Sequence, residues 1–260
     1  AASDVYKRQL YTFAERLFVL TLYRRALRRA GRVITVSAPA REELSERLNI
    51  DPSKIEVMVP LAVPAPRGNP SQAELEHVRR KYALPEHFIL MIGTVEPRHN
   101  HQAVFAALAD AASPAGMVVC GRRTAWSDYL LGYARARRIA ARVDFIYELT
   151  PSDLPALFRL ARVFAYLPDA DAEASVVPVV EALRAGLPMV LSDTQVNREA
   201  AGEAAAYVRP EARGEVLAAL ENALEDVSWR RTMQERERRR AELFSEYAVA
   251  ERLMQIYTSL

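Results

Sequence analysis

The sequence has one cysteine, few lysines and no long apolar run, and each shortage excludes a class of protein. Cys120 is the only cysteine among the 260 residues, which excludes an internal disulfide and fits a reducing, cytoplasmic compartment. Lysine occurs only at positions 7, 54 and 81, and none of them is a P-loop lysine. No apolar run approaches the length of a membrane span. The 35 basic and 33 acidic residues leave a net charge of +2, so the charge balance indicates neither a nucleic acid nor an acidic partner.

Short apolar runs alternate with amphipathic stretches of helical period through most of the chain. The runs predict β-strands at residues 33–37, 55–59, 88–94, 117–121, 143–147, 163–167, 189–192 and 205–208. Helical patterns cover residues 10–29, 71–82, 101–111, 126–140 and 179–185. Continuous apolar strands separated by helices are typical of parallel βαβ units with both sheet faces covered. The sequence therefore predicts an α/β fold with a doubly wound, Rossmann-like parallel sheet.

A proline-rich stretch predicts how the chain is divided. Residues 60–70 contain four prolines and a glycine, which is typical of an extended linker. We expect residues 10–63 to be the end of a larger N-terminal domain, residues 64–246 a Rossmann-like domain, and residues 247–260 a closing helix. Residues 1–9 fit poorly with the rest of the chain and resemble translated adaptor sequence, so we expect a non-native leader on an N-terminally truncated chain.

Two stretches outside the predicted sheet bear on possible partners. Residues 17–23 (LFVLTLY) are flanked by arginines and fit either a helix lying on a membrane surface or a helix whose packing partner is absent. Residues 230–240 alternate arginine with Glu235 and Glu237, and charges at i,i+3 and i,i+4 predict a solvated helix face. The interleaved acids argue against a nucleic-acid interface there.

Residues 173–188 (EASVVPVVEALRAGLP) carry the strongest signal for a ligand site. Pro178 suits a first helical position, and the Gly-Leu-Pro at the end of the stretch stops the helix. Glu181 is then expected in the first turn, where the helix dipole favours anions, with Glu173 on the preceding loop. Amides for a phosphate and carboxylates for sugar hydroxyls suit a phosphorylated, hydroxyl-rich ligand. The alternative is a charged loop before an ordinary capped helix.

A second candidate site comes directly after the predicted strand 88–94, in residues 93–100 (GTVEPRHN). Strand, glycine turn and helix form the place where an open parallel sheet binds ligands, at its carboxyl edge. Gly93 permits close backbone approach, while Arg98 and His99 supply permanent or switchable charge. Cys120 is expected to be a buried small hydrophobe. The sequence has no G-x-G-x-x-G and no zinc pattern, so a dinucleotide-dependent dehydrogenase is a weak alternative and no metal is expected.

Taken in chain order, these motifs resemble those of the retaining glycosyltransferases of family 4, which have the GT-B fold. Residues 88–100 look like the family's phosphate loop, G-T-x-E-P-R-K-N, and residues 143–157 resemble its base-binding segment, with Leu149 at the contact to the base. Glu173 and Glu181 match the E-x7-E signature. Residues 33–44, 192–199 and 244–257 match flanking segments of the family.

The resemblance implies an enzyme that moves a hexose from a nucleotide sugar, UDP- or GDP-linked, to a saccharide or lipid-linked acceptor with retention. It also implies a role in polysaccharide or glycoconjugate synthesis, with no metal and no further cofactor. Residues 64–246 would hold the donor, and the acceptor site would lie mostly on the missing N-terminal domain, so we expect no turnover by this chain alone. The implied catalytic residues are Glu173, which contacts the donor sugar in the family, His99 and Arg98. The implied donor-binding residues are Gly93, Thr94, Leu149, Val176, Val177 and Glu181, the last for the ribose hydroxyls.

The chain departs from the family pattern at three of these positions. His99 stands where the family has a lysine, Thr94 where an arginine often comes after the glycine, and Val176 lies in a stretch that is normally G-F-G-L. Each lost cation removes transition-state stabilisation on the scale of about 3 kcal/mol. A β-branched residue also resists positive φ and close approach of the backbone to a donor. These departures keep a second hypothesis open, a catalytically silent GT-B protein that acts as a binding or regulatory partner.

Overall fold

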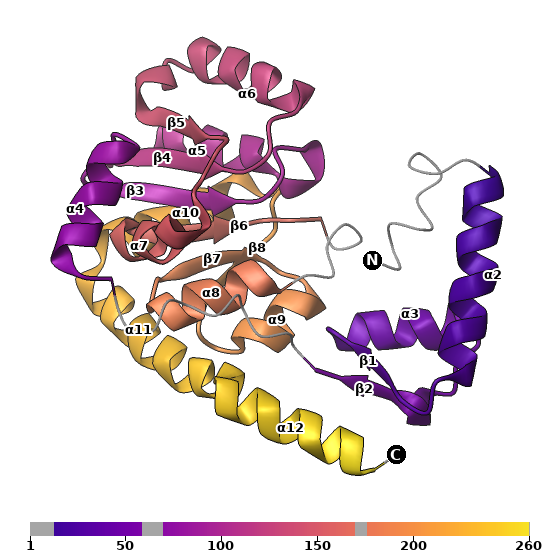
Figure 1. Cartoon of the computed structure of the whole chain (residues 1–260). Coiled ribbons are helices and arrows are strands. Elements are labelled where there is room, and N and C mark those ends of the chain that lie inside the picture. Colours follow the sequence, from indigo (N-terminus) through magenta and orange to yellow (C-terminus); the bar gives the residue numbers. More distant parts are fainter. Residues whose placement is uncertain (1–12, 59–69, 170–175, 260) are drawn as a thin grey trace.

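The computed structural model describes residues 13–58, 70–169 and 176–259, which form a small N-terminal unit and a larger α/β body (Figure 1). The expected leader and nearly all of the predicted linker lie outside these residues. The domain boundary at residues 63 and 64 therefore stays a prediction.

Six parallel strands form the sheet of the body, in the order β5-β4-β3-β6-β7-β8. Their bounds are β3 Phe88–Ile92, β4 Gly116–Cys120, β5 Val143–Ile146, β6 Val163–Tyr166, β7 Met189–Ser192 and β8 Ala206–Val208. From β3 the chain builds outward through β4 to β5, then returns to place β6 on the other side of β3. This is the doubly wound order, and its topological switch point lies between β3 and β6. The predicted α/β fold class is confirmed, and all six strands form where the apolar runs predict them.

Helices cover both faces of this sheet because successive side chains of a buried strand point to opposite sides (Figure 1). Along β3, Phe88 and Leu90 enter one hydrophobic core, while Ile89 and Met91 enter the other. The first core is closed by α4 (Gln72–Lys81), α7 (Leu154–Leu160), α8 (Val177–Ala185) and α9 (Gln195–Ala201). The second is closed by α5 (His101–Asp110), α6 (Ala125–Ala136) and α10 (Arg213–Glu225).

Short 3-10 turns join several of these elements, and one of them lies where a helix ends early. They are η1 Pro52–Lys54, η2 Pro97–His99, η3 Ala140–Arg142, η4 Pro151–Asp153 and η5 Glu242–Phe244. Helix α6 stops at Ala136 instead of residue 140, because Arg138 adopts φ 60° in the left-handed region before η3 begins.

The N-terminal unit consists of α2 (Phe13–Arg29), β1 (Val33–Thr35), α3 (Ala38–Leu48) and β2 (Ile55–Val57). β1 and β2 pair in parallel, as a strand–helix–strand pattern requires. Polar contacts between described residues join this unit to the body. The Ala38 N–H donates to Glu199 Oε2 at 2.9 Å, and Arg252 Nη2 lies 2.8 Å from Glu56 Oε2.

Helices α11 (Val227–Ala241) and α12 (Glu246–Thr258) complete the described chain, and α11 packs on α8. The prediction of a solvated face on α11 is wrong for two of its charges. Arg230 is only 7% exposed and its Nη1 donates to Ala223 O at 3.1 Å and Leu224 O at 2.5 Å, in the last turn of α10. Glu237 is fully buried. Packing on α8 and α10 covers these charges, which the local charge pattern does not reveal.

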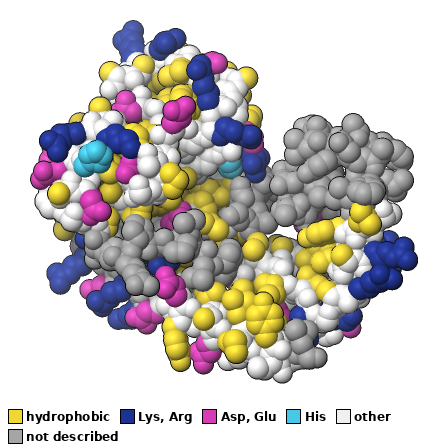
Figure 2. All heavy atoms as spheres, viewed as in Figure 1, with side chains coloured by type: hydrophobic (Ala, Val, Ile, Leu, Met, Phe, Trp, Pro, Cys, Tyr) yellow, Lys and Arg dark blue, Asp and Glu magenta, His cyan; other side chains and the backbone are white. Residues whose placement is uncertain are grey.

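Large hydrophobic side chains are exposed on the outer helices. Tyr247, Met254 and Tyr257 of α12 are exposed. Figure 2 shows hydrophobic side chains gathered along the lower edge of the molecule, where α12 runs in Figure 1. Leu22 and Tyr23 of α2 are also exposed. No helix among the described residues is long and apolar enough to cross a membrane. The membrane-surface interpretation of α2 stays a prediction.

Candidate functional site

The two candidate stretches meet at the carboxyl edge of the sheet, because every strand of the body points the same way. The loop of residues 93–100 leaves β3, and α8 begins after the chain has left β6. These two strands flank the switch point, where the chain diverges to opposite sides and leaves a crevice for ligands. The loop after β3 and the start of α8 therefore lie at the same edge of the sheet, as the strand and helix patterns predict, and their role in binding stays a prediction.

Backbone atoms lie unusually close together where β3 and β4 end. The Gly93 N–H donates to Cys120 O at 3.0 Å, and a Cβ on Gly121 would lie 1.8 Å from Gly93 O. Gly93 itself has φ 144°, and a Cβ there would lie 3.2 Å from the His99 ring. Only glycines fit this approach. Because Gly93 and Gly121 have no side chains, they cover none of the backbone at the ends of β3 and β4.

His99 turns under the loop that carries it. Its ring is 5% exposed, and Nδ1 lies 2.5 Å from Thr94 O. The ring also lies near those of His101 and Tyr166, with centroid distances of 5.9 and 6.4 Å. Thr94 thus contributes a carbonyl group to holding His99. The buried His99 ring therefore supports the conformation of the 93–100 loop through its contact with the Thr94 carbonyl.

Two arginines, one in the 93–100 loop and one in the loop after β4, lie close to Glu96 of the 93–100 loop. Arg98 Nε lies 2.7 Å from Glu96 Oε2, and Arg122 Nη2 lies 3.8 Å from Glu96 Oε1. The hydrogen bond from Arg98 is the main cause that holds the pKa of Glu96 below its usual value. The side chain of Arg122 is 76% exposed, which lets it turn toward an anion.

Helix α8 begins at Val177, one residue earlier than the sequence predicts. Pro178 is consequently the second helical residue and Glu181 lies in the second turn, so the prediction of Glu181 in the first turn is wrong. Val176 is the N-cap, with φ −102° and no side-chain cap hydrogen bond. The whole residue is 1% exposed, and its side chain packs in the core. Since φ is negative, the expected conflict between a β-branched residue and positive φ does not arise.

The start of α8 offers backbone N–H groups to an anion. The first N–H groups of a helix have no partner within it, and Pro178 has none to offer. Val176, Val177 and Val179 carry the other N–H groups at this helix start; Val177 is half-buried, whereas Val176 and Val179 are buried. The helix dipole adds positive potential at the same point.

Glu181 is half-buried, and this changes its ionisation. Burial raises its pKa to about 7, and the nearby Arg184 offsets part of that rise. Both protonation states are therefore populated near neutral pH. An ionised Glu181 accepts hydrogen bonds from hydroxyl groups, whereas the protonated form is a weaker acceptor.

The remaining predicted residues lie in two loops. Leu149 comes after β5, is half-buried and packs against the core that α7 covers. The next residue is fixed to α4, because the Thr150 N–H donates to Tyr82 Oη at 3.1 Å. Glu173 falls in residues 170–175, outside the described residues. Its separation from Glu181 therefore stays a prediction.

Asn100 ends the 93–100 motif but is not among the predicted site residues, and the structure places it between the loop after β3 and the chain after β6. Its Nδ2 donates to Leu167 O at 2.9 Å and to Asp169 Oδ1 at 2.7 Å. It precedes α5 with φ 52°, a conformation that asparagine tolerates better than most residues. Across residues 13–58, 70–169 and 176–259, no three His, Cys, Asp or Glu side chains are grouped so as to hold a metal ion.

Comparison with known proteins identifies the family. The family Glycosyl transferases group 1 matches residues 74–240, more than half of the chain and the whole of the sheet just described. The chain belongs to this family. It is 28% identical over 219 residues to O-antigen chain mannosyltransferase B of Escherichia coli, covering 82% of this chain and 56% of that protein. It is 24% identical over 215 residues to O-antigen chain mannosyltransferase RfbU of Salmonella typhimurium, covering 81% and 56%. The chain therefore spans about half the length of these two relatives.

Solved structures support the fold. Anabaena Alr3699/HepE in complex with UDP and glucose superposes with a TM-score of 0.80 at 14% identity, covering 99% of this chain and 70% of that one. WaaG, a glycosyltransferase involved in lipopolysaccharide biosynthesis, superposes with a TM-score of 0.72 at 18% identity, covering 95% and 70%. The GT-B-type fold expected from the motifs is confirmed.

Proposed function

We propose that this chain is the donor-binding part of a glycosyltransferase that moves a hexose from a UDP- or GDP-linked sugar to a saccharide or lipid-linked acceptor. The observation that carries the proposal is the convergence of the 93–100 loop and the start of α8 at the switch point of the sheet. The names of the two bacterial relatives support a mannose donor and a polysaccharide product. Transfer with retention and without a metal is part of the proposal and rests on the family resemblance.

The proposal gives a role to each of the groups named below, of which Glu173 lies outside the described residues. The N–H groups of Val176, Val177 and Val179 stabilise the negative charge that develops on the departing diphosphate, because preset dipoles need no reorganisation. Gly93 lets the backbone approach the same phosphates. Glu181 accepts hydrogen bonds from the ribose hydroxyls. Leu149 packs against the base, and Glu173 contacts the sugar.

A second candidate function, a catalytically silent binding partner, is favoured by the positions of the loop's cationic groups. His99 is buried against Thr94 O, and Arg98 is paired with Glu96. Arg122 and the dipole of α8 then carry most of the positive potential offered to a diphosphate. Transfer of sugar by the full-length protein, abolished by Glu181→Ala, would exclude this alternative.

Calorimetry with a panel of nucleotide sugars tests the main proposal, and pH gives it a specific signature. With a pKa of about 7, Glu181 is about one-tenth ionised at pH 6, so donor affinity should rise about tenfold from pH 6 to pH 8. A nucleotide sugar suits the test because its diphosphate is esterified at both ends and does not titrate in this range. Glu181→Gln should bind more weakly at pH 8 and lose the pH dependence. No binding of any UDP or GDP sugar at either pH would refute the proposal.

Two further statements belong to the same proposal, one on turnover and one on localisation. The 260-residue chain should bind donor without transferring sugar, and robust transfer by this chain alone would contradict that. We also place the protein in the cytoplasm, with α2 as a peripheral contact to the membrane. Flotation with anionic vesicles tests the contact, and Leu22→Asp should reduce it if Leu22, which is 52% exposed, enters the lipid.

A further inference from the structure

Three consecutive residues at the exit of β6 are each held by a hydrogen bond from a neighbouring loop. We call residues 167–169 the β6 stem. Leu167 O accepts from Asn100 Nδ2 at 2.9 Å, and Pro168 O accepts from Ser192 Oγ at 2.8 Å. The Asp169 N–H donates to the carbonyl of residue 98 at 2.9 Å, while Asp169 Oδ1 accepts the second hydrogen bond of Asn100 at 2.7 Å. The stem is therefore held from the β3 side by the 93–100 loop and from the β7 side by Ser192.

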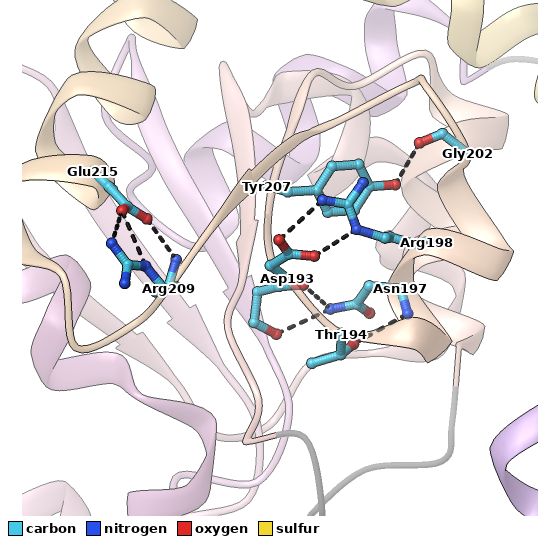
Figure 3. Close-up of polar contacts among 9 residues, drawn as sticks. Asp193, Thr194, Asn197, Arg198, Gly202, Tyr207, Arg209 and Glu215 are labelled. Atoms are coloured by element: carbon cyan, nitrogen blue, oxygen red, sulfur yellow. Dashed lines mark hydrogen bonds and ion pairs between the residues drawn. The ribbon is translucent and has the colours of Figure 1, made fainter.

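The anchor on the β7 side is itself buried and fully engaged. Ser192 and Asn197 are each 1% exposed. Asn197 Nδ2 donates to Ser192 O at 2.9 Å and to Ser192 Oγ at 3.0 Å, which orients the hydroxyl hydrogen toward the stem. The Asn197 N–H in turn donates to Thr194 Oγ1 at 3.2 Å (Figure 3).

A second layer of contacts stiffens the loop that presents this anchor. Arg198 forms a two-pronged ion pair with Asp193, at 2.5 and 2.9 Å. The same guanidinium lies over the ring of Tyr207, 4.3 Å from its centroid, and Figure 3 shows Arg198 between the two partners. Bidentate pairing and ring stacking leave the loop after β7 few alternative conformations.

The stem lies beyond the part of β6 that pairs in the sheet, since pairing with β7 ends at Tyr166 and pairing with β3 ends earlier. β3 and β4 pair over five residues, but β3 and β6 pair only at Ile89 with Val163 and Leu90 with Phe164. Beyond Leu90 the two strands diverge at the switch point. Asn100 spans the opening with two hydrogen bonds and joins the loop after β3 to the chain after β6, beside the backbone bond from Asp169 to the carbonyl of residue 98. These bonds cross the switch point, which is where open parallel sheets bind their ligands.

We propose that Asn100 is a positioning residue for the donor sugar, with Ser192 as the opposite anchor of the β6 stem. The proposal rests on the proposed function. The chain leaves the stem at Asp169 toward residues 170–175, which carry Glu173, and re-enters the described structure at the buried Val176. Fixing the stem relative to the 93–100 loop fixes where the sugar-contacting segment starts relative to the loop that meets the diphosphate.

The test compares two affinities in each variant. Asn100→Gly removes the amide but tolerates φ 52°, and Asn100→Asp keeps the shape while replacing the donor with an acceptor. UDP-glucose and GDP-mannose are each measured against their own free nucleotide. Both variants should lose the part of the affinity that depends on the sugar, about tenfold, and keep the affinity for the free nucleotide within about twofold. Hydrogen exchange of the Asp169 amide should become about tenfold faster in both.

The matched control is Asn49→Gly, because Asn49 also has φ 52° but ends α3 in the N-terminal unit. This control should change neither affinity nor the exchange of Asp169. An unchanged ratio of the two affinities in both Asn100 variants would overturn the inference while leaving the proposed function intact. An equal loss for sugar and free nucleotide would also overturn it, since that marks a general distortion. If the unmodified chain binds no nucleotide at all, the proposed function fails, and the positioning role of Asn100 fails with it.

Discussion

The buried carboxyl of Glu237 predicts an unusual dependence of stability on pH. Glu237 lies on α11 with no exposed surface, and neither of its oxygens has a hydrogen-bond partner among the described residues. Burial raises its pKa from 4.5 to about 9. The folded protein therefore keeps this acid protonated at neutral pH, whereas the unfolded chain ionises it.

The sign and size of the effect come from this difference in proton binding. Between the unfolded pKa of 4.5 and the folded pKa of about 9, the folded state binds the extra proton, so the free energy of unfolding falls as pH rises. Each pH unit in this window removes about 1.4 kcal/mol, or about 4 kcal/mol from pH 5 to pH 8. Glu237→Gln keeps the shape but cannot ionise. It should match the unmodified protein near pH 5 and be more stable by up to about 4 kcal/mol at pH 8.

Urea unfolding at pH 5, 6, 7 and 8, monitored by tryptophan fluorescence, measures this difference. Glu235→Gln is the matched control, because Glu235 lies on the same helix and is exposed, and it should show no such trend. A constant difference between Glu237→Gln and the unmodified protein across the four pH values would refute the reasoning.

Three further predictions concern two glycines and the cysteine. Gly121→Ala should lower the free energy of unfolding by about 3 kcal/mol or more and weaken nucleotide binding, because its Cβ would lie 1.8 Å from Gly93 O; urea titration and calorimetry check both. Gly132→Ala on α6, where a new Cβ meets nothing within 4 Å, should instead stabilise by about 0.5–1 kcal/mol. Cys120 should resist iodoacetamide at pH 8 in the folded protein and react in urea, since burial raises its pKa to about 11; mass spectrometry detects the label, and fast labelling without urea would contradict the assignment.

Much of the fold is predictable because its signals are local. Each signal acts through its own few residues. The apolar runs form strands, the helix with Pro178 forms as α8, and the glycine turn follows β3. The family resemblance predicts that these elements form one site at the edge of the sheet. The error at Glu181 is of the same local kind: α8 begins one residue early, at Val177, which moves Glu181 into the second turn.

Other features of the site depend on distant contacts and have no local signal. His99 resembles an available charge in sequence, but the loop folds over it and leaves it 5% exposed. The alternating charges of α11 predict a solvated face, yet Glu237 is buried because the helix packs on α8. A residue's spacing along one helix cannot show which neighbour will cover it.

The sequence by itself determined the kinds of element, their order, and the edge of the sheet at which the two candidate stretches lie, since periodicity and turn chemistry are encoded within a few residues. Only the tertiary structure decided which charges lose their water and which strands separate at the switch point. It also revealed that Asn100 bridges that opening to a chain segment 67 residues further along. Burial and long-range hydrogen bonds arise from the packing of elements far apart in sequence, so no single stretch contains them.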